Sequence, residues 1–498
     1  MSVYLVEITG KASGVSTTYR YCTGLGTYNG GNYYEPRIEN TATSAREIFV
    51  DGQIGGKQTK SIGEMSLVNI DGGLDSLYSV LFDGGNVLVR YFDGSGDKWV
   101  QRYIVDQVTF ETRRIRFRLR DQEYKLNTPI QTSTYAGNNS LPSGLEGGPE
   151  LTGMKKPRCF GVVNNMTPVL VNTSRLIYQV NDGAIYDIKN VYDKGAAFTR
   201  GADYASQSAM ESTAPAAGEY RVCKAGGYFR IGSSPAGLVT ATVWQASPPY
   251  YTTAAQLAKD IVTNIAGIAS GSQVAADYTT LDALNAGSVG LMCDDGMTIA
   301  SALDQILSTV GAWWGFDDTG KFRLARFDLP TGAPVVSWEE SDFLDYEFEL
   351  QTINGIGAPT KSVTLNHDIN WTAQDASSLA GVVSRTTGRA AWLGKRSRSV
   401  KKTASVDNVM AQDLVYETLF AGAGYAGPEA TRRLNLLKTK RSRLRVEMHV
   451  DAITTMPKLG DEVHVTIPRY GHGGGDYKRV IGIETDFAID KITFILWG

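Results

Sequence analysis

The sequence predicts a β-rich α+β protein made of several domains. Its 498 residues exceed what one hydrophobic core usually serves, roughly 100–200 residues, so three or four cores are expected. Glycine is frequent at 54 residues, and 25 Tyr and 16 Phe accompany it, which favours many short strands joined by tight turns. Hydrophobic residues at 42% and charged residues at 20% are typical of packed protein and exclude bulk disorder.

Residues 1–131 predict a first domain built from strands. Apolar, β-prone segments occupy residues 4–8, 86–92 and 99–108. The turn sequence DGSGD separates the last two segments and indicates a hairpin.

Residues 114–120 are the clearest strand of this domain. Ile115, Phe117 and Leu119 alternate with arginines, and period two puts the apolar side chains on a core and the arginines on the opposite face. Four like charges in a row need acids on a neighbouring strand, solvent or an anionic partner. The candidate interface residues of this domain are therefore Arg114, Arg116, Arg118 and Arg120.

Residues 132–157 break the strand pattern, because they contain five glycines and three prolines. A stretch this long without periodicity is a domain linker or an extended arm. Its composition buries little apolar area alone, so we expect order only through contact with another domain or subunit. A second β-rich domain is expected at 158–250, with candidate strands at 174–180, 220–223, 228–231 and 238–243.

Helices are expected only after that domain. Apolar residues recur at helical spacing in 254–268 and 299–310, and AWWGF, DDTG and KFRLARF then indicate a hairpin, so residues 251–330 predict a small α/β module. The last domain is expected at 331–498. Its candidate strands are 361–366, 443–450, 462–467, 479–483 and 492–497, and its candidate helices are 409–420 and 428–437, the second with Pro428 in its first turn.

The sequence contains no convincing catalytic motif. Residues 315–321 match GxxxxGK, but Phe322 stands where Ser or Thr is needed and the context is strand, turn, strand, so a hairpin turn is expected. HGGG at 472–475 lacks a matching GxSxG elbow and is interpreted as a loop between strands. The four histidines form no HExxH pattern, so no metal site and no enzyme are predicted.

The charge of the chain is unevenly distributed. Residues 385–402 and residues 432–445 each carry seven cations and no acid; removing these fourteen from the 49 cations leaves 35 against 52 acids, a net charge of −17 in an overall −3. The basic region is either a solvated face or a surface for an acidic partner or polyanion. The second run supplies three further candidate interface residues, Arg441, Arg443 and Arg445.

Residues 458–498 resemble the closing domain of tail hub, or baseplate hub, proteins of long-tailed bacteriophages and gene transfer agents. The resemblance rests on the sequences GDEV, PRYG, RVIGI and the terminal ILWG. Residues 363–381 are similar to the Asn-Trp-Thr segment of that family, residues 297–327 to its helix-hairpin module, and the N-terminus to its tube-like first domain.

The resemblance implies a virion protein that forms a homotrimeric hub at the distal end of a tail, with tube-like β-barrel domains at 1–131 and 331–498. Such a hub adapts a six-fold tail tube or distal tail ring to a threefold tip, anchors the tape measure protein and a central fibre or spike, and closes the channel until DNA ejection. DNA would pass without specific binding, and contact with the host envelope would be indirect. The seven candidate arginines would face acidic groups at domain and subunit interfaces, with a neutral or acidic channel.

The cysteines depart from part of that family. Some relatives at tail tips hold an iron–sulfur cluster through four cysteines, whereas Cys22, Cys159, Cys223 and Cys293 lack the local spacing, so buried thiols and no cofactor are expected. No apolar run approaches 18 residues and no secretory signal is present, so assembly in the host cytoplasm is expected. The alternative function is a polysaccharide-binding or degrading tail component, since 8 Trp and 25 Tyr could build sugar platforms.

Overall fold

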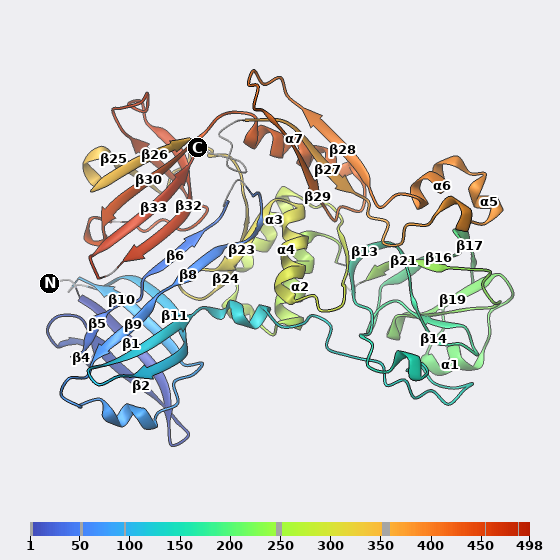
Figure 1. Cartoon of the computed structure of the whole chain (residues 1–498), viewed down its shortest axis with the longest axis horizontal. Helices are drawn as coiled ribbons and strands as arrows, with labels where there is room; N and C mark the ends of the chain where they lie inside the picture. The colour runs from blue at the N-terminus through green and yellow to red at the C-terminus, as the bar shows by residue number, and fades with distance from the viewer. Residues whose placement is uncertain are drawn as a thin grey trace.

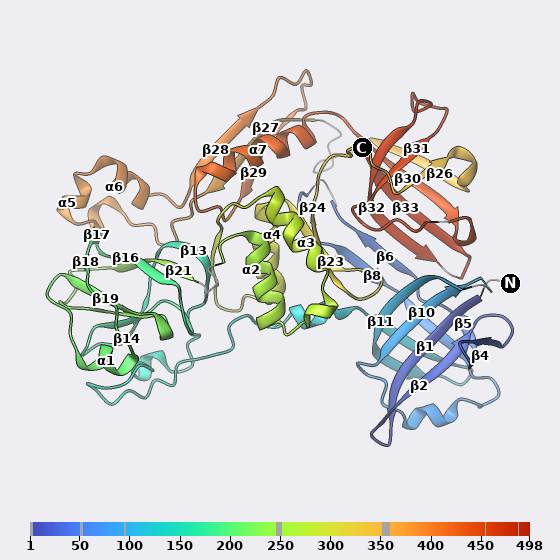
Figure 2. The ribbon, with the colours of Figure 1, turned by 180° about the vertical axis from the view of Figure 1, so that it is seen from behind.

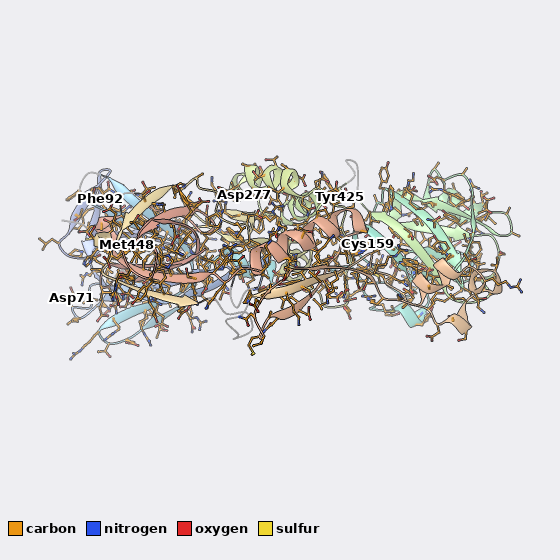
Figure 3. The ribbon with its side chains drawn as sticks, turned by 90° about the horizontal axis from the view of Figure 1, so that it is seen from above. Asp71, Phe92, Cys159, Asp277, Tyr425 and Met448 are labelled. Atoms are coloured by element: carbon orange, nitrogen blue, oxygen red, sulfur yellow. The ribbon has the colours of Figure 1, made fainter. Side chains whose placement is uncertain are left out.

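The protein is an elongated molecule with two large sheets at one end, a helical module in the middle and a second β-rich domain at the other end (Figure 1). This computed structural model describes residues 3–49, 53–93, 96–245, 251–350, 359–453, 455–486 and 488–498. Seen from above, the body is flat, with Phe92 and Met448 at one end and Cys159 towards the other (Figure 3). The predicted β-rich α+β class is confirmed.

The first sheet contains nine strands in the order β3-β4-β2-β1-β10-β11-β12-β9-β5. The predicted strand at 114–120 is β12, and its residues Ile115, Phe117 and Leu119 are buried. The strands are β1 (Val3–Ala12), β2 (Val15–Cys22), β3 (Thr27–Asn29), β4 (Asn32–Pro36), β5 (Ile38–Asn40), β9 (Glu64–Val68), β10 (Asn86–Phe92), β11 (Asp97–Phe110) and β12 (Arg114–Arg120).

The second large sheet is formed by the C-terminal part of the chain, in the order β25-β31-β32-β33-β30-β26, with β6 and β8 added from the N-terminal part. The last strand, β33, is almost wholly buried, because its side chains face a core on both sides. The strands are β6 (Ser44–Glu47), β8 (Thr59–Ile62), β25 (Val336–Glu339), β26 (Asp345–Leu350), β30 (Ser442–His449), β31 (Glu462–Thr466), β32 (Asp476–Asp486) and β33 (Lys491–Trp497).

The two large sheets share one hydrophobic core. β6 leaves the first domain and pairs antiparallel with β32, and Figure 2 shows β6 and β8 running between the two sheets. The Phe49 ring stacks on Phe327 with centroids 4.3 Å apart and meets Trp497 at 5.2 Å. Among the described residues the first and last strands of each sheet do not pair with each other. The expectation of closed barrels at the two chain ends is therefore wrong, and the structure has two open sheets packed together.

The middle module carries three helices against a small sheet. α4 (Ile299–Thr309) begins at Thr298, whose side chain accepts from the Ser301 N–H, as predicted. The first helix, α2 (Ala254–Asp260), continues as a π-turn (Ile261–Ile265), and α3 (Ala275–Leu284) was not predicted. The sheet comprises β7 (Gly56–Lys57), β23 (Ala312–Phe316) and β24 (Phe322–Arg326). The residues between β23 and β24 form the predicted hairpin turn.

The domain at the far end contains two five-stranded sheets and the short helix α1 (Gln207–Ser212). Tyr135 and Leu151 of the preceding arm are buried against this domain, so the arm is ordered by contact with it. The expected boundary near residue 250 lies outside the described residues. The strands are β13 (Cys159–Met166), β14 (Val169–Asn172), β15 (Ile177–Gln179), β16 (Asp187–Asp193), β17 (Ala196–Ala197), β18 (Thr199–Arg200), β19 (Glu219–Cys223), β20 (Tyr228–Ile231), β21 (Val239–Gln245) and β22 (Gly290–Met292).

A three-stranded sheet, β28-β27-β29, lies above the module and packs against α7. The helix expected at 409–420 is wrong: residues 412–417 form β29, because Leu414 and Tyr416 alternate with three exposed side chains. α7 begins earlier than expected, so Pro428 lies inside the helix. The elements are β27 (Thr360–His367), α5 (Gly381–Ser384), α6 (Thr387–Leu393), β28 (Arg398–Thr403), β29 (Gln412–Glu417) and α7 (Ala423–Leu437). Among the described residues, none of the helices has the length and apolarity that a membrane crossing requires.

Candidate functional site

The arginine row on β12 is neutralised by acids of its own sheet. Arg116 lies 2.6 Å from Glu111 and 3.3 Å from Glu64, and Arg118 lies 2.6 Å from Asp106. β12 runs between β11 and β9, so acids on or beside both neighbours reach the row. Arg114 and Arg120 are paired in the same way, and the four side chains are 38–55% exposed. The row is therefore a half-exposed, charge-balanced surface.

The three candidate arginines at and beside β30 contact different partners, and Arg443 joins the C-terminal sheet to the N-terminal hairpin. Arg443 donates to Glu47 of β6 at 2.9 Å and lies 3.6 Å from Glu349. Arg445 donates to Glu484 at 2.8 Å. Arg441 differs, since its guanidinium lies 5.2 Å from the centre of the Trp497 ring. Two of these three residues thus face acids, and Arg443 does so across the joint between the chain ends.

The remaining cations at the start of the 432–445 run are buried in α7. Arg433 is 1% exposed and donates to Glu429 at 2.8 Å and to the Thr309 carbonyl at 3.0 Å. Arg432 donates to Glu429 at 2.7 Å. Burial opposes the charged form of Glu429, but the two guanidinium groups outweigh it and lower the pKa of this carboxyl. Five of the seven cations in this run therefore contact acids or an aromatic ring of the same chain: Arg432, Arg433, Arg441, Arg443 and Arg445.

The 385–402 run remains largely at the surface. Arg398 lies 3.1 Å from Asp368 and Lys401 3.5 Å from Asp413, a carboxylate that Lys401 shares with Lys361. All residues of β28 except Val400 are exposed. Within the described part of the chain no ion pair involves three further cations of the run, Arg385, Lys395 and Lys402. β28 is also the last strand of its sheet, so it is a basic sheet edge.

An acidic sheet edge exists on the other sheet. β26 is the last strand of the C-terminal sheet and pairs with β30, and residues 339–349 contain six acids and no Lys or Arg. Asp345, Glu347 and Glu349 are exposed. Sequence reasoning missed this strand, although the alternation of Tyr346 and Phe348 with acids is the period-two signal that could have found it.

A groove of about 810 Å³ runs beside β26. The Phe348 ring stacks on His472 with centroids 4.5 Å apart, and His472 is held by Asp476. The HGGG motif thus lies in a loop between β31 and β32, as expected, and its His472 lines the groove. The groove is lined by Glu340, Asp345, Tyr346, Glu347, Phe348, Ser442, Arg469, Tyr470 and His472.

A smaller polar cavity of about 280 Å³ lies at the joint between the first sheet and the module. Lys60 reaches Asp121 at 3.2 Å inside it, and burial lowers the pKa of this lysine. Nearby, Arg46 donates to Asp318 of the β23–β24 turn at 2.5 Å. The Arg46 pair ties β6 to the module, and the Lys60 pair ties β8 to the segment that follows β12, so we interpret the cavity as part of a domain joint.

The four cysteines are buried and unbonded to one another. Burial raises the pKa of each thiol, and that of Cys293 to about 12, so they remain neutral packing groups at ordinary pH. Among the described residues, no three His, Cys, Asp or Glu side chains gather as a metal site would require.

No family model and no curated protein matches this chain. Solved structures to which this chain is similar include the 43 kDa tail protein of prophage MuSo2 from Shewanella oneidensis, at 11% identity and a TM-score of 0.40 over 98% of this chain and 96% of that one. A tail protein from Neisseria meningitidis MC58 is similar at 10% identity and a TM-score of 0.41, over 99% and 96% of the two chains. A chain of the virion of a native gene transfer agent particle is similar at 13% identity and a TM-score of 0.43, over 75% and 91%.

Proposed function

We propose that this chain is a structural protein of a bacteriophage tail or related particle, and that three copies form the hub at the distal end of the tail. The resemblance of residues 458–498 to hub proteins supports this role. The observation that carries it is the shared core of the two large sheets: sheets from opposite ends of the chain pack on one hydrophobic cluster. Three such units would present six sheet domains around one axis, which suits a six-fold tail tube or distal tail ring.

The finer role follows from this position. The hub anchors the tape measure protein, carries a central fibre or spike, and closes the channel until DNA ejection, while DNA passes without specific binding. The role is structural, because the two motifs that resemble catalytic sequences lie in turns between strands. We propose no cofactor, since the four thiols are buried packing groups.

Image averaging of the particles that contain this protein tests the proposal. We expect density for three copies at the distal end of the tail, related by a threefold axis. Density for the chain in the head or along the tail shaft, or a twofold arrangement at the tip, would contradict it. The alternative, a polysaccharide-binding or degrading component, predicts binding or cleavage of host glycans by the purified chain.

A further inference from the structure

The molecule carries two exposed sheet edges of opposite charge. β26 ends one sheet with Asp345, Glu347 and Glu349 exposed. β28 ends another with Arg398, Lys401 and Lys402 exposed, and both strands are six residues long. They belong to different parts of the molecule (Figure 1), and within the described residues each pairs on one side only.

Each edge keeps charge that its own chain does not pair, although Arg398 and Lys401 of the basic edge lie near Asp368 and Asp413. Glu349 is 54% exposed and lies 3.6 Å from Arg443, which already donates to Glu47. In the described structure Asp345 and Glu347 have no ion pair, and the same holds for Lys402. The other basic run, in contrast, is neutralised by Glu429, Glu47 and Glu484. Both edges therefore carry exposed charge that is available to another molecule.

Charge decides which pairing each edge allows. A sheet edge exposes unpaired N–H and C=O groups that a further strand can satisfy, and charged side chains are the usual device against unwanted pairing. An acidic edge repels a second acidic edge, and a basic edge repels a second basic one. The arrangement thus disfavours a twofold contact of like edges and leaves the opposite edge of another copy as the complementary partner.

The groove beside β26 can accommodate a basic edge strand of another copy. Its volume of about 810 Å³ gives room for side chains of an added strand. Tyr346 and Tyr470 offer apolar surface for the long stems of lysine and arginine, and the carboxylates of Glu340 and Glu347 offer partners for their charged ends. Arg469 is the one cation of this lining, and its guanidinium lies 5.3 Å from the centre of the Tyr470 ring.

We propose that β28 of one copy docks in the groove along β26 of the next copy, extending the C-terminal sheet across the subunit boundary. In the proposed contact each copy offers β26 to one neighbour and β28 to another, so the contact is heterologous and its repetition closes into a ring or continues as a helix. The inference rests on the proposed hub assembly, for which it supplies the contact between subunits. Its occupant is a second copy of this chain.

Charge reversal on the full-length chain tests the contact. Two variants, Lys401→Glu with Lys402→Glu and Asp345→Lys with Glu347→Lys, place like charges on both edges. We expect each to weaken self-association about tenfold or more, measured by sedimentation velocity at low salt, and wild-type association to weaken as salt rises. The matched control for the first variant, Lys125→Glu with Lys259→Glu, changes the net charge by the same amount at exposed sites on neither edge and should associate as the wild type does.

The chain that combines all four reversals swaps the signs of the two edges. We expect it to regain self-association, which misfolded variants would not do, and circular dichroism checks that each variant is folded. Three outcomes would each overturn the contact. The double variants could assemble like the wild type, the folded chain with all four substitutions could stay dissociated, or the wild-type chain could be monomeric at every concentration. The position and symmetry of the chain in particles test the tail function separately. A threefold hub that still assembles from the charge-reversed variants would refute only this interface.

Discussion

The two basic runs, residues 385–402 and 432–445, have the same number of cations and no acids, yet they lie in opposite surroundings. The second run begins on a helix that packs against the module and continues on β30, a strand with a neighbour on each side. Acids therefore meet it from α7, β6 and β32. The first run passes through short helices and ends on an edge strand, where only one side has a neighbour.

The difference shows that the number of cations in a run does not decide its role. Cations on an interior element must find acids within the fold, because an unpaired buried charge is strongly destabilising. Cations on an edge can remain solvated, and they stay available to another molecule. The 432–445 run should therefore govern stability, and the 385–402 run should govern association.

The largest effect is expected at Glu429. Glu429→Gln leaves the buried guanidinium of Arg433 without a carboxylate, while Arg432 keeps only Asp328, and this should lower the free energy of unfolding by about 3–5 kcal/mol. Urea unfolding followed by tryptophan fluorescence measures this loss. The exposed Glu150, changed to Gln, is the control and should have little effect. Equal unfolding midpoints for the two variants would remove the distinction between the runs.

The same carboxylate predicts a pH dependence. The pKa of Glu429 is lowered in the folded state from its ordinary value of 4.5, so its ion pairs contribute fully above that value and are lost as pH falls through the lower folded pKa. The wild-type chain should therefore lose more stability than Glu429→Gln on acidification below pH 4.5. Parallel stability curves for the two proteins in this range would show that Glu429 is not charged in the fold.

A smaller effect is expected at Arg443, which is 34% exposed and joins β30 to β6 through Glu47. Arg443→Ala should lower the free energy of unfolding by about 1 kcal/mol or less, because partly solvated pairs are weak. The nearby exposed Lys440, changed to Ala, serves as its control. A loss from Lys440→Ala as large as that from Arg443→Ala would contradict the assignment of Arg443 as a link between the chain ends.

The smallest effect on stability is expected on the basic edge. Lys401→Glu with Lys402→Glu changes solvated side chains and one exposed pair with Asp413, so the free energy of unfolding should fall by less than about 1 kcal/mol. Thermal unfolding at a concentration where the chain is monomeric measures it. Strong destabilisation of the monomer would show that the first run also stabilises the fold.

The same weak effect is expected for the arginine row of β12. Arg116→Ala removes a side chain that is 41% exposed and paired with Glu64 and Glu111, and its loss should lower the free energy of unfolding by about 0–1 kcal/mol. The acids around the row all belong to the first domain. From the sequence we expected these arginines to face acids at domain and subunit interfaces. Reversing this row should therefore affect ring assembly less than reversing either edge.

Local patterns were enough for part of the fold and of the site. Period-two alternation determined β12 and β30, helical spacing and the Thr298 cap determined α4, and the DDTG sequence determined the β23–β24 turn. Each depends on neighbours within a few residues, so the sequence expresses it directly. The need of the arginine row for acids also followed from the sequence alone.

The tertiary structure decided what depends on distant segments. Ser44 and Thr485, 441 residues apart, share a hydrogen bond where β6 joins β32, and no local pattern encodes that pairing. Residues 412–417 have apolar spacing compatible with a helix, but pairing with β27 made them a strand. Strand order decides which acid neutralises each arginine. It also decides that β26 and β28 end their sheets. Strand order arises from packing of the whole chain, because backbone groups and buried charges can be satisfied by any neighbour that the global fold supplies.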